Sequence, residues 1–408
     1  MIVYKMWGAL MARVLSRVVV ARKGDDDDDD CRGGGIIVVM PDVRNYPWWG
    51  TVPDMVDDVD TSLQWVMDNI RRYGGDPTNV VVVGQSAGGH LALMSILNKI
   101  MTVSRQNKDQ KSQLQQEQRQ NPNHSTDRED STPFDSLLSS DNSAHKRTET
   151  KWKPSDLKGF IGVSAPCSLE GIQHVFQQMG LNKNLVDRIF GHCTEDHDPL
   201  RILKNLIYQQ QHQQKSITSG QQQEVVETQS ETEERILLGS PPVFDLKNEF
   251  PPAIKFYHGT SDRTVPCEGS QRFYDELRRG FRLVGLSDTS NTRGNKNDGN
   301  NCSLTAEESD NPSHHHSPSP RESHDVQLVL YDGWSHTDPI LEGPMDADHT
   351  FHYDLFCDVR RWTSRSPQQQ HQQQQELRLT WPNDDDPVIR DRLCPHFMVV
   401  AGRFFMPF

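Results

Sequence analysis

A run of four valines that leads directly into a glycine-rich turn constrains the fold more than any other feature of this sequence. Val80–Val83 is uninterrupted and apolar, as in a strand that is covered on both faces. Gly84–His90 (GQSAGGH) follows at once and leads into a helical pattern. A G-x-S-x-G pattern between a buried strand and a helix predicts a nucleophile elbow, a turn so tight that small residues must flank Ser86. The chain is therefore expected to build a sheet with strand–helix crossings.

Strand-like and helix-like segments alternate along the chain. Strands are predicted at Ile36–Met40, Val80–Val83, Phe160–Val163, Ala253–Tyr257 and Val326–Tyr331. Helices are predicted at Met55–Ile70, where apolar residues recur at helical spacing, and near His90–Ile100, Asn182–Phe190, Glu268–Arg279 and Phe351–Trp362. Strands that alternate with helices predict right-handed crossovers and a mainly parallel sheet flanked by helices, which is an α/β fold.

Polar low-complexity tracts interrupt this pattern at residues 22–32, 102–150, 209–234, 285–324 and 364–375. They are rich in Gln, Asn, Ser and Asp and show no apolar periodicity, so they cannot bury enough surface to offset the entropy cost of ordering them. They also explain why only 34% of the residues are hydrophobic. We expect one α/β domain over residues 1–408, with these tracts as disordered insertions in its loops.

Charge and cysteine content exclude several classes of function. The formal net charge of −14 argues against a broad nucleic-acid-binding surface. The seven cysteines are scattered and odd in number, so we expect reduced thiols in a cytosol-facing environment and no metal site. The apolar stretch 6–20 contains two arginines and is too short to cross a bilayer, so an amphipathic helix is predicted there.

A catalytic serine needs a base, and the base needs a carboxylate that orients it. In folds with a nucleophile elbow, the chain order is Ser, then Asp or Glu, then His. Asp262 follows the predicted strand Ala253–Tyr257, and His336 follows the last predicted strand. The sequence contains 17 histidines, and position after the last strand selects His336. The backbone N–H of Ala87 is the expected oxyanion donor.

Other polar residues near these positions favour structural roles. Asp332 and Asp338 flank His336, but neighbours in sequence rarely meet an imidazole in triad geometry, so each is expected to serve a turn or a helix cap. His258 is expected to be a loop hydrogen-bonder, and His90 a structural residue of the elbow helix.

Several segments across the chain together resemble one family. They are Tyr4–Gly8, Pro41–Pro47, Gly84–His90, His258–Cys267, Leu328–Tyr331 with His336–Asp338, and Arg403–Phe408. Together they resemble the α/β-hydrolase superfamily and, more narrowly, the isoprenylcysteine α-carbonyl methylesterases (prenylcysteine methylesterases). The triad is shared with other esterases and formamidases, whereas Tyr-Lys-x-Trp-Gly and His-Thr-Asp narrow the choice.

The resemblance implies hydrolysis of the methyl ester on a prenylated C-terminal cysteine, with the prenylated protein C-terminus as partner and with no cofactor. It implies that Ser86 is the nucleophile, His336 the general base and then acid, and Asp262 the orienting carboxylate. Family members are anchored in the membranes of the endoplasmic reticulum and Golgi apparatus, which the resemblance extends to this protein.

This sequence departs from the family at its beginning. The second oxyanion donor of the superfamily comes from a glycine-rich loop, which in the methylesterases lies just upstream of the segment Tyr4–Gly8. Met1 precedes Tyr4 by only three residues. We therefore expect that this loop, the strands before it and the membrane anchor are missing from the sequence, as they would be from an incomplete gene product.

Tryptophans are candidates for the walls of a prenyl pocket. Trp48 and Trp49 follow Pro47 near the expected rim of the site, and Trp334 stands two residues before His336. A prenyl group needs a wide apolar slot, to which these side chains can contribute. Packing within the core and loops is the alternative for each of them.

Two other functions stay open at this stage. A general carboxylesterase or an arylformamidase would use the same triad. A non-catalytic binding protein with a hydrolase fold would account for the absent oxyanion loop. The intact order of serine, aspartate and histidine argues against this alternative, because a site that had lost its catalytic function would not need to keep all three residues.

Overall fold

The computed structural model describes residues 36–120, 150–223, 245–288 and 324–363, except residues 47, 171, 179, 181, 346 and 347. The helix predicted at 6–20, the segments Tyr4–Gly8 and Arg403–Phe408, and the tracts 22–32 and 364–375 lie outside these residues. Because the single domain predicted for residues 1–408 also extends beyond them, it stays a prediction.

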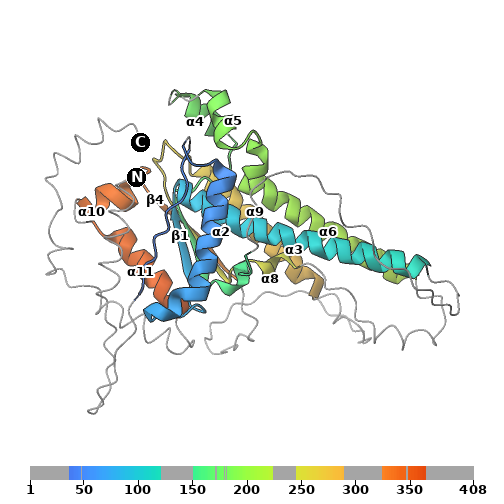
Figure 1. The fold of residues 1–408 in the computed structure, drawn as a ribbon. Coiled ribbons are helices and arrows are strands. Elements are labelled where there is room, and N and C mark those ends of the chain that lie inside the picture. The colour runs from blue at the N-terminus through green and yellow to red at the C-terminus, as the bar shows by residue number, and fades with distance from the viewer. Residues whose placement is uncertain are drawn as a thin grey trace, which may run out of the picture.

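Four parallel strands form the described sheet (Figure 1). They are β1 (Val81–Gln85), β2 (Gly159–Val163), β3 (Ala253–Gly259) and β4 (Asp325–Tyr331). Their order across the sheet is the same as their order along the chain, and each neighbouring pair is parallel. All four strands were predicted, with ends that differ by a residue or two. The parallel sheet and its crossover helices confirm the predicted α/β fold class.

Helices cover both faces of the sheet, with α11 on the opposite side from α2, α3 and α9 (Figure 1). The longer helices are α2 (Val52–Asn69), α3 (Ala87–Gln120), α6 (Pro199–Gln223), α9 (Glu268–Asp288) and α11 (Thr350–Thr363). The shorter helical segments are η1 (Ile70–Tyr73), η2 (Pro154–Asp156), α4 (Ile172–Gln178), α5 (Lys183–Ile189), η3 (Thr194–His197), α8 (Leu246–Glu249), the π-helix η6 (Asp338–Glu342) and α10 (Gly343–Met345).

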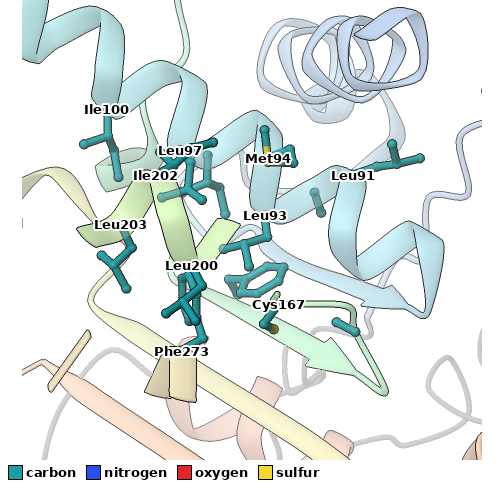
Figure 2. Close-up of a cluster of buried hydrophobic side chains, with 14 of the residues drawn as sticks. Leu91, Leu93, Met94, Leu97, Ile100, Cys167, Leu200, Ile202, Leu203 and Phe273 are labelled. Atoms are coloured by element: carbon teal, nitrogen blue, oxygen red, sulfur yellow. The ribbon is translucent and has the colours of Figure 1, made fainter. Parts of the chain in front are cut away.

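The alternation of side chains along the strands divides the core between the two faces. Phe160 of β2 and Phe256 of β3 belong to a large apolar cluster with α2, α3, α6 and α9. Figure 2 shows part of this cluster, in which side chains of α3 pack with those of α6 and α9. The next residues, Ile161 and Tyr257, belong to a smaller cluster with Phe351 of α11. The sheet is therefore covered on both faces, as its apolar strands predicted.

The strand predicted at Ile36–Met40 is wrong, because these residues have no strand assignment in the structure. Ile36 and Val38 pack against Phe356 of α11, whereas Ile37 and Val39 are exposed. In the described sheet, β1 pairs with β2 alone, so the apolar segment lacks a hydrogen-bonded neighbour. An apolar run predicts burial, but a strand also needs a partner that local sequence does not supply.

The disorder predicted for three polar tracts is wrong at their edges, because helices continue into them. α3 reaches Gln120, α6 reaches Gln223 and α9 reaches Asp288. In the first two tracts, the Ser104 hydroxyl of α3 donates a hydrogen bond to Gln209 of α6 (3.1 Å), where the two helices run side by side in Figure 1. Adding a residue to an existing helix costs much less than starting one, and Gln, Lys and Glu are good helix formers.

Within the described ranges, no helix combines the length and the apolar content needed to cross a bilayer. Cys167, Cys193, Cys267 and Cys357 are free thiols. The same ranges contain no cluster of histidine, cysteine and carboxylate side chains arranged to hold a metal ion.

Candidate active site

The predicted elbow is the turn between β1 and α3. Ser86 is the single residue that connects the two elements. Its φ of 51° is a left-handed conformation that is unusual for a residue other than glycine. A Cβ atom at Gly84 would lie 2.5 Å from the Cα of Gly89, and one at Gly89 would lie 2.6 Å from the Cβ of Ala165. Gly84 and Gly89 are therefore required by the close approach of the helix to the strand, whereas a Cβ atom at Gly88 would meet nothing within 4 Å. The Ser86 N–H donates to the carbonyl of Val163 (2.8 Å), which ties the turn to β2.

The structure brings Ser86, His336 and Asp262 together in a chain of hydrogen bonds. His336 Nε2 lies 2.8 Å from Ser86 Oγ, and His336 Nδ1 lies 2.7 Å from Asp262 Oδ2. Since an ionised carboxylate only accepts, Nδ1 carries the ring proton and Nε2 accepts from the serine hydroxyl. The three side chains come from the elbow, the loop after β3 and the loop after β4, all at the carboxyl edge of the sheet.

Contacts between the loops after β3 and β4 hold His336 in place. The Thr260 hydroxyl donates to Asp332 (3.1 Å) and accepts from the Gly333 N–H (2.8 Å). The Ser261 N–H donates to the carbonyl of Trp334 (3.0 Å). On the other side of His336, Asp338 accepts from the Ser335 N–H (2.6 Å), so Asp332 and Asp338 stabilise turns, as predicted.

The Asp262 carboxylate is enclosed by hydrogen-bond donors. Its Oδ1 accepts from the N–H groups of Thr264 (2.9 Å) and Val265 (2.8 Å). Its Oδ2 faces His336 Nδ1 and also lies 3.2 Å from His258 Nε2. Burial by itself would raise the pKa of Asp262, but the hydrogen bonds from His258 and His336 outweigh burial and lower the pKa to about 2. Asp262 is therefore ionised at neutral pH.

Two contacts of the site were not found from the sequence. His258 was expected to bond within its loop, which it does through Val265, but its contact with Asp262 was missed. The contact could have been suspected because His258 and Asp262 are only four residues apart. Gln85, next to the nucleophile, is buried and donates to the backbone carbonyl of His336 (3.4 Å). No local sequence pattern predicts this contact.

Ala87 and His90 occupy the first turn of α3. Ala87 is the first helical residue, so its N–H has no acceptor four residues earlier within the helix and lies at the positive end of the helix dipole. This position suits an oxyanion donor. His90 is buried and its Nδ1 lies 3.0 Å from the carbonyl of Pro166, a structural contact that anchors the elbow helix to the loop after β2.

The three tryptophans lie in different environments. Trp48 and Trp49 precede α2 and remain 81% and 70% exposed. Trp334 is half-buried and stacks on Tyr331, with ring centroids 4.2 Å apart. They do not form one enclosed apolar slot, and their role in a substrate pocket stays a prediction.

A parallel sheet with crossover helices, a serine in a left-handed turn after a strand, and an Asp–His pair from the following loops define the class of this protein. The chain has the α/β-hydrolase fold.

Comparisons with known proteins agree with this class. The BD-FAE family model matches residues 34–162. The chain is 24% identical over 414 residues to the isoprenylcysteine alpha-carbonyl methylesterase ICME of Arabidopsis thaliana, a match that covers 99% of this chain and 60% of that protein. It is 25% identical over 276 residues to the probable isoprenylcysteine alpha-carbonyl methylesterase ICMEL1 of Oryza sativa subsp. japonica, which covers 68% of this chain and 44% of that one.

A third curated relative is similar over a short stretch, and one solved structure has a broader but weaker match. The probable methylesterase ICME of Oryza sativa subsp. japonica is 37% identical over 102 residues, which is 25% of this chain and 20% of that one. The propionate-bound esterase Est2 of Thermogutta terrifontis is 13% identical, with a TM-score of 0.32 and coverage of 82% and 68% of the two chains. The chain spans about half the length of the curated methylesterases it matches over most of its own length.

Proposed function

We propose that this protein is a serine carboxylic ester hydrolase. The observation that carries the proposal is the hydrogen-bonded chain from Ser86 Oγ through the His336 imidazole to Asp262, with contacts of 2.8 and 2.7 Å. A serine hydroxyl is a weak nucleophile unless a neighbouring base takes its proton, and His336 Nε2 stands at the distance that this transfer requires.

In the proposed mechanism, Ser86 Oγ attacks the ester carbonyl while His336 Nε2 accepts the hydroxyl proton. The backbone N–H of Ala87 stabilises the resulting oxyanion. Collapse of this intermediate breaks the bond to the alkoxy group, which leaves as the alcohol with the proton from His336. Water then attacks the acyl-enzyme with His336 again as base, and the acid is released. Asp262 keeps the imidazole in the required tautomer and stabilises its charged form.

The proposed substrate is the methyl ester of a prenylated C-terminal cysteine, so that the alcohol released is methanol. Support comes from the similarity to proteins named isoprenylcysteine alpha-carbonyl methylesterases, in two cases over 99% of this chain. A protein with this substrate would work beside membranes, and the resemblance extends the endoplasmic reticulum and Golgi location of the family to it. Both the substrate and the membrane association are proposals.

Labelling with a fluorophosphonate tests the reaction class. The reagent should form a covalent adduct on Ser86 in the wild-type protein and none in Ser86→Ala, because only an activated serine reacts. Ser335→Ala is a matched control, since Ser335 lies beside His336 but contributes its backbone N–H rather than its hydroxyl to the loop. A wild-type protein that is folded but not labelled would contradict the proposal and favour a non-catalytic binding protein.

A substrate panel tests the specificity. Turnover of a farnesylcysteine methyl ester should exceed that of short acyl esters and of N-formylkynurenine. Comparable or better activity on the short esters would instead indicate a general carboxylesterase, and preference for the formamide would indicate an arylformamidase, because both use the same triad.

A further inference from the structure

A second histidine contacts the carboxylate of the site. Asp262 Oδ2 lies between two imidazoles, with His336 Nδ1 at 2.7 Å and His258 Nε2 at 3.2 Å. His258 belongs to β3 and is fully buried. The mechanism proposed above gives His258 no task, although it touches the group that orients the base.

The surroundings of His258 determine where its proton lies. Its Nε2 is 2.8 Å from the carbonyl of Val265, and a carbonyl can only accept, so Nε2 must carry a hydrogen. Its Nδ1 is 2.9 Å from the hydroxyl of Ser270, which can donate to it and also lies 3.3 Å from the carbonyl of Ala165. The Nε2–H is thus directed at the Val265 carbonyl, and Asp262 Oδ2, which receives the proton of His336, lies 3.2 Å from the same nitrogen.

These contacts leave the Asp262 carboxylate a single orientation. Two backbone N–H groups hold Oδ1, so rotation of the carboxylate is blocked at one oxygen. His258 contacts the other oxygen, Oδ2, and, through Val265, also closes the loop that carries those donors. The position of Asp262 Oδ2 in turn sets the plane of the His336 ring and therefore the direction of Nε2 toward Ser86.

We propose that His258 is a positioning residue, which fixes Asp262 through its Nε2–H, and that the Val265 carbonyl and the Ser270 hydroxyl together favour the tautomer that makes this contact. The inference builds on the proposed function, because it assigns how the triad of that function is held in place. If so, the reactivity of Ser86 depends on a hydrogen-bond donor at the Nε2 position of residue 258. The alternative is that it depends only on the volume of the imidazole ring.

Two substitutions separate these possibilities. The side-chain amide of glutamine in His258→Gln reaches the position of Nε2, so it can still donate to Asp262. The shorter amide in His258→Asn reaches only the position of Nδ1, so it keeps the Ser270 contact and loses the Asp262 contact. His352→Gln is the matched control, since His352 is an equally buried histidine on α11 whose Nδ1 contacts His349.

The first readout is the rate of fluorophosphonate labelling of Ser86. His258→Asn should label about tenfold to a hundredfold more slowly than wild type, the scale of a lost hydrogen bond to a charged group. His258→Gln and His352→Gln should stay close to wild type. Ser270→Ala, which keeps the His258 ring, should slow labelling in the same direction by a smaller factor, and it tests the proposal even if His258→Asn does not fold.

The second readout does not need a reactive serine. The proton between His336 Nδ1 and Asp262 should give a downfield NMR resonance that is absent from His336→Gln. It should persist in His258→Gln and broaden or vanish in His258→Asn.

Equal behaviour of the Gln and Asn variants in both readouts would overturn the proposal. A wild-type protein whose downfield resonance depends on His258 but whose serine is never labelled would contradict the proposed function and retain the positioning role.

Discussion

Asp262 in the loop after β3 and Asp358 on α11 are both buried carboxylates, with 6% and 5% of their surface exposed, but their partners differ. Asp358 contacts the ammonium of Lys255 at 2.9 and 2.8 Å and accepts from the hydroxyl of Tyr257. Asp262 has two backbone N–H groups and two imidazoles around it. The charge of Asp358 is thus neutralised by the ammonium of Lys255, whereas the charge of Asp262 is stabilised by hydrogen-bond donors.

This difference separates a structural carboxylate from one that is available for chemistry. Lys255 and Asp358 neutralise each other's charge between β3 and α11, so neither charge is buried without a partner. Burial and the nearby charge of Asp358 raise the pKa of Tyr257, so its hydroxyl keeps its proton and donates. Asp262 keeps a net negative charge beside His336, which can stabilise an imidazolium during a reaction.

The largest effect is expected from changing the two aspartates in turn. Asp262→Asn should slow labelling of Ser86 by about 10⁴-fold, since an amide neither fixes the tautomer of His336 nor stabilises its charge. Asp358→Asn, measured at a temperature where it remains folded, should label at close to the wild-type rate. Equal losses in the two variants would show that the carboxylates do not have the separate roles inferred here.

Changes at the Lys255–Asp358 pair should affect the free energy of unfolding rather than the labelling rate. Lys255→Met leaves Asp358 buried without its cation and should lower the free energy of unfolding by about 3–5 kcal/mol in denaturant titrations. The double variant Lys255→Met/Asp358→Leu should recover most of this loss, because no buried charge remains unpaired. If the double variant were as unstable as the single one, the ion pair itself would be stabilising the attachment of α11.

The smallest effect is expected from acid within the first pH unit below 6.5, and it compares a buried histidine of α3 with one of α11. Burial lowers the pKa of His90 on α3 to about 4 and that of His352 on α11 to about 3, from 6.5. Between these values and pH 6.5 the unfolded chain binds the extra protons, so stability falls as the pH decreases, by about 1.4 kcal/mol per pH unit for each histidine. His90→Gln and His352→Gln should each flatten this dependence, and unchanged slopes would contradict the assigned burial effects.

Much of the sheet and of the triad could be predicted from the sequence because the relevant patterns are local. Buried parallel strands need continuous apolar runs, and a tight strand–helix turn needs small residues, as at Gly84 and Gly89. The prediction at Ile36–Met40 failed because pairing is not local. The helical edges of the polar tracts were missed because a helix that is stabilised by packing can extend into residues that would not start one.

By itself, the sequence determined the strand–turn–helix unit around Ser86 and the order of serine, aspartate and histidine along the chain. Only the tertiary structure decided that Ser86 and His336, 250 residues apart, come within 2.8 Å. It also decided that one buried aspartate meets two imidazoles while the other meets a lysine. The physical reason is that backbone geometry follows from neighbouring residues, whereas the partner of a buried charge depends on which strands and helices the sheet places side by side.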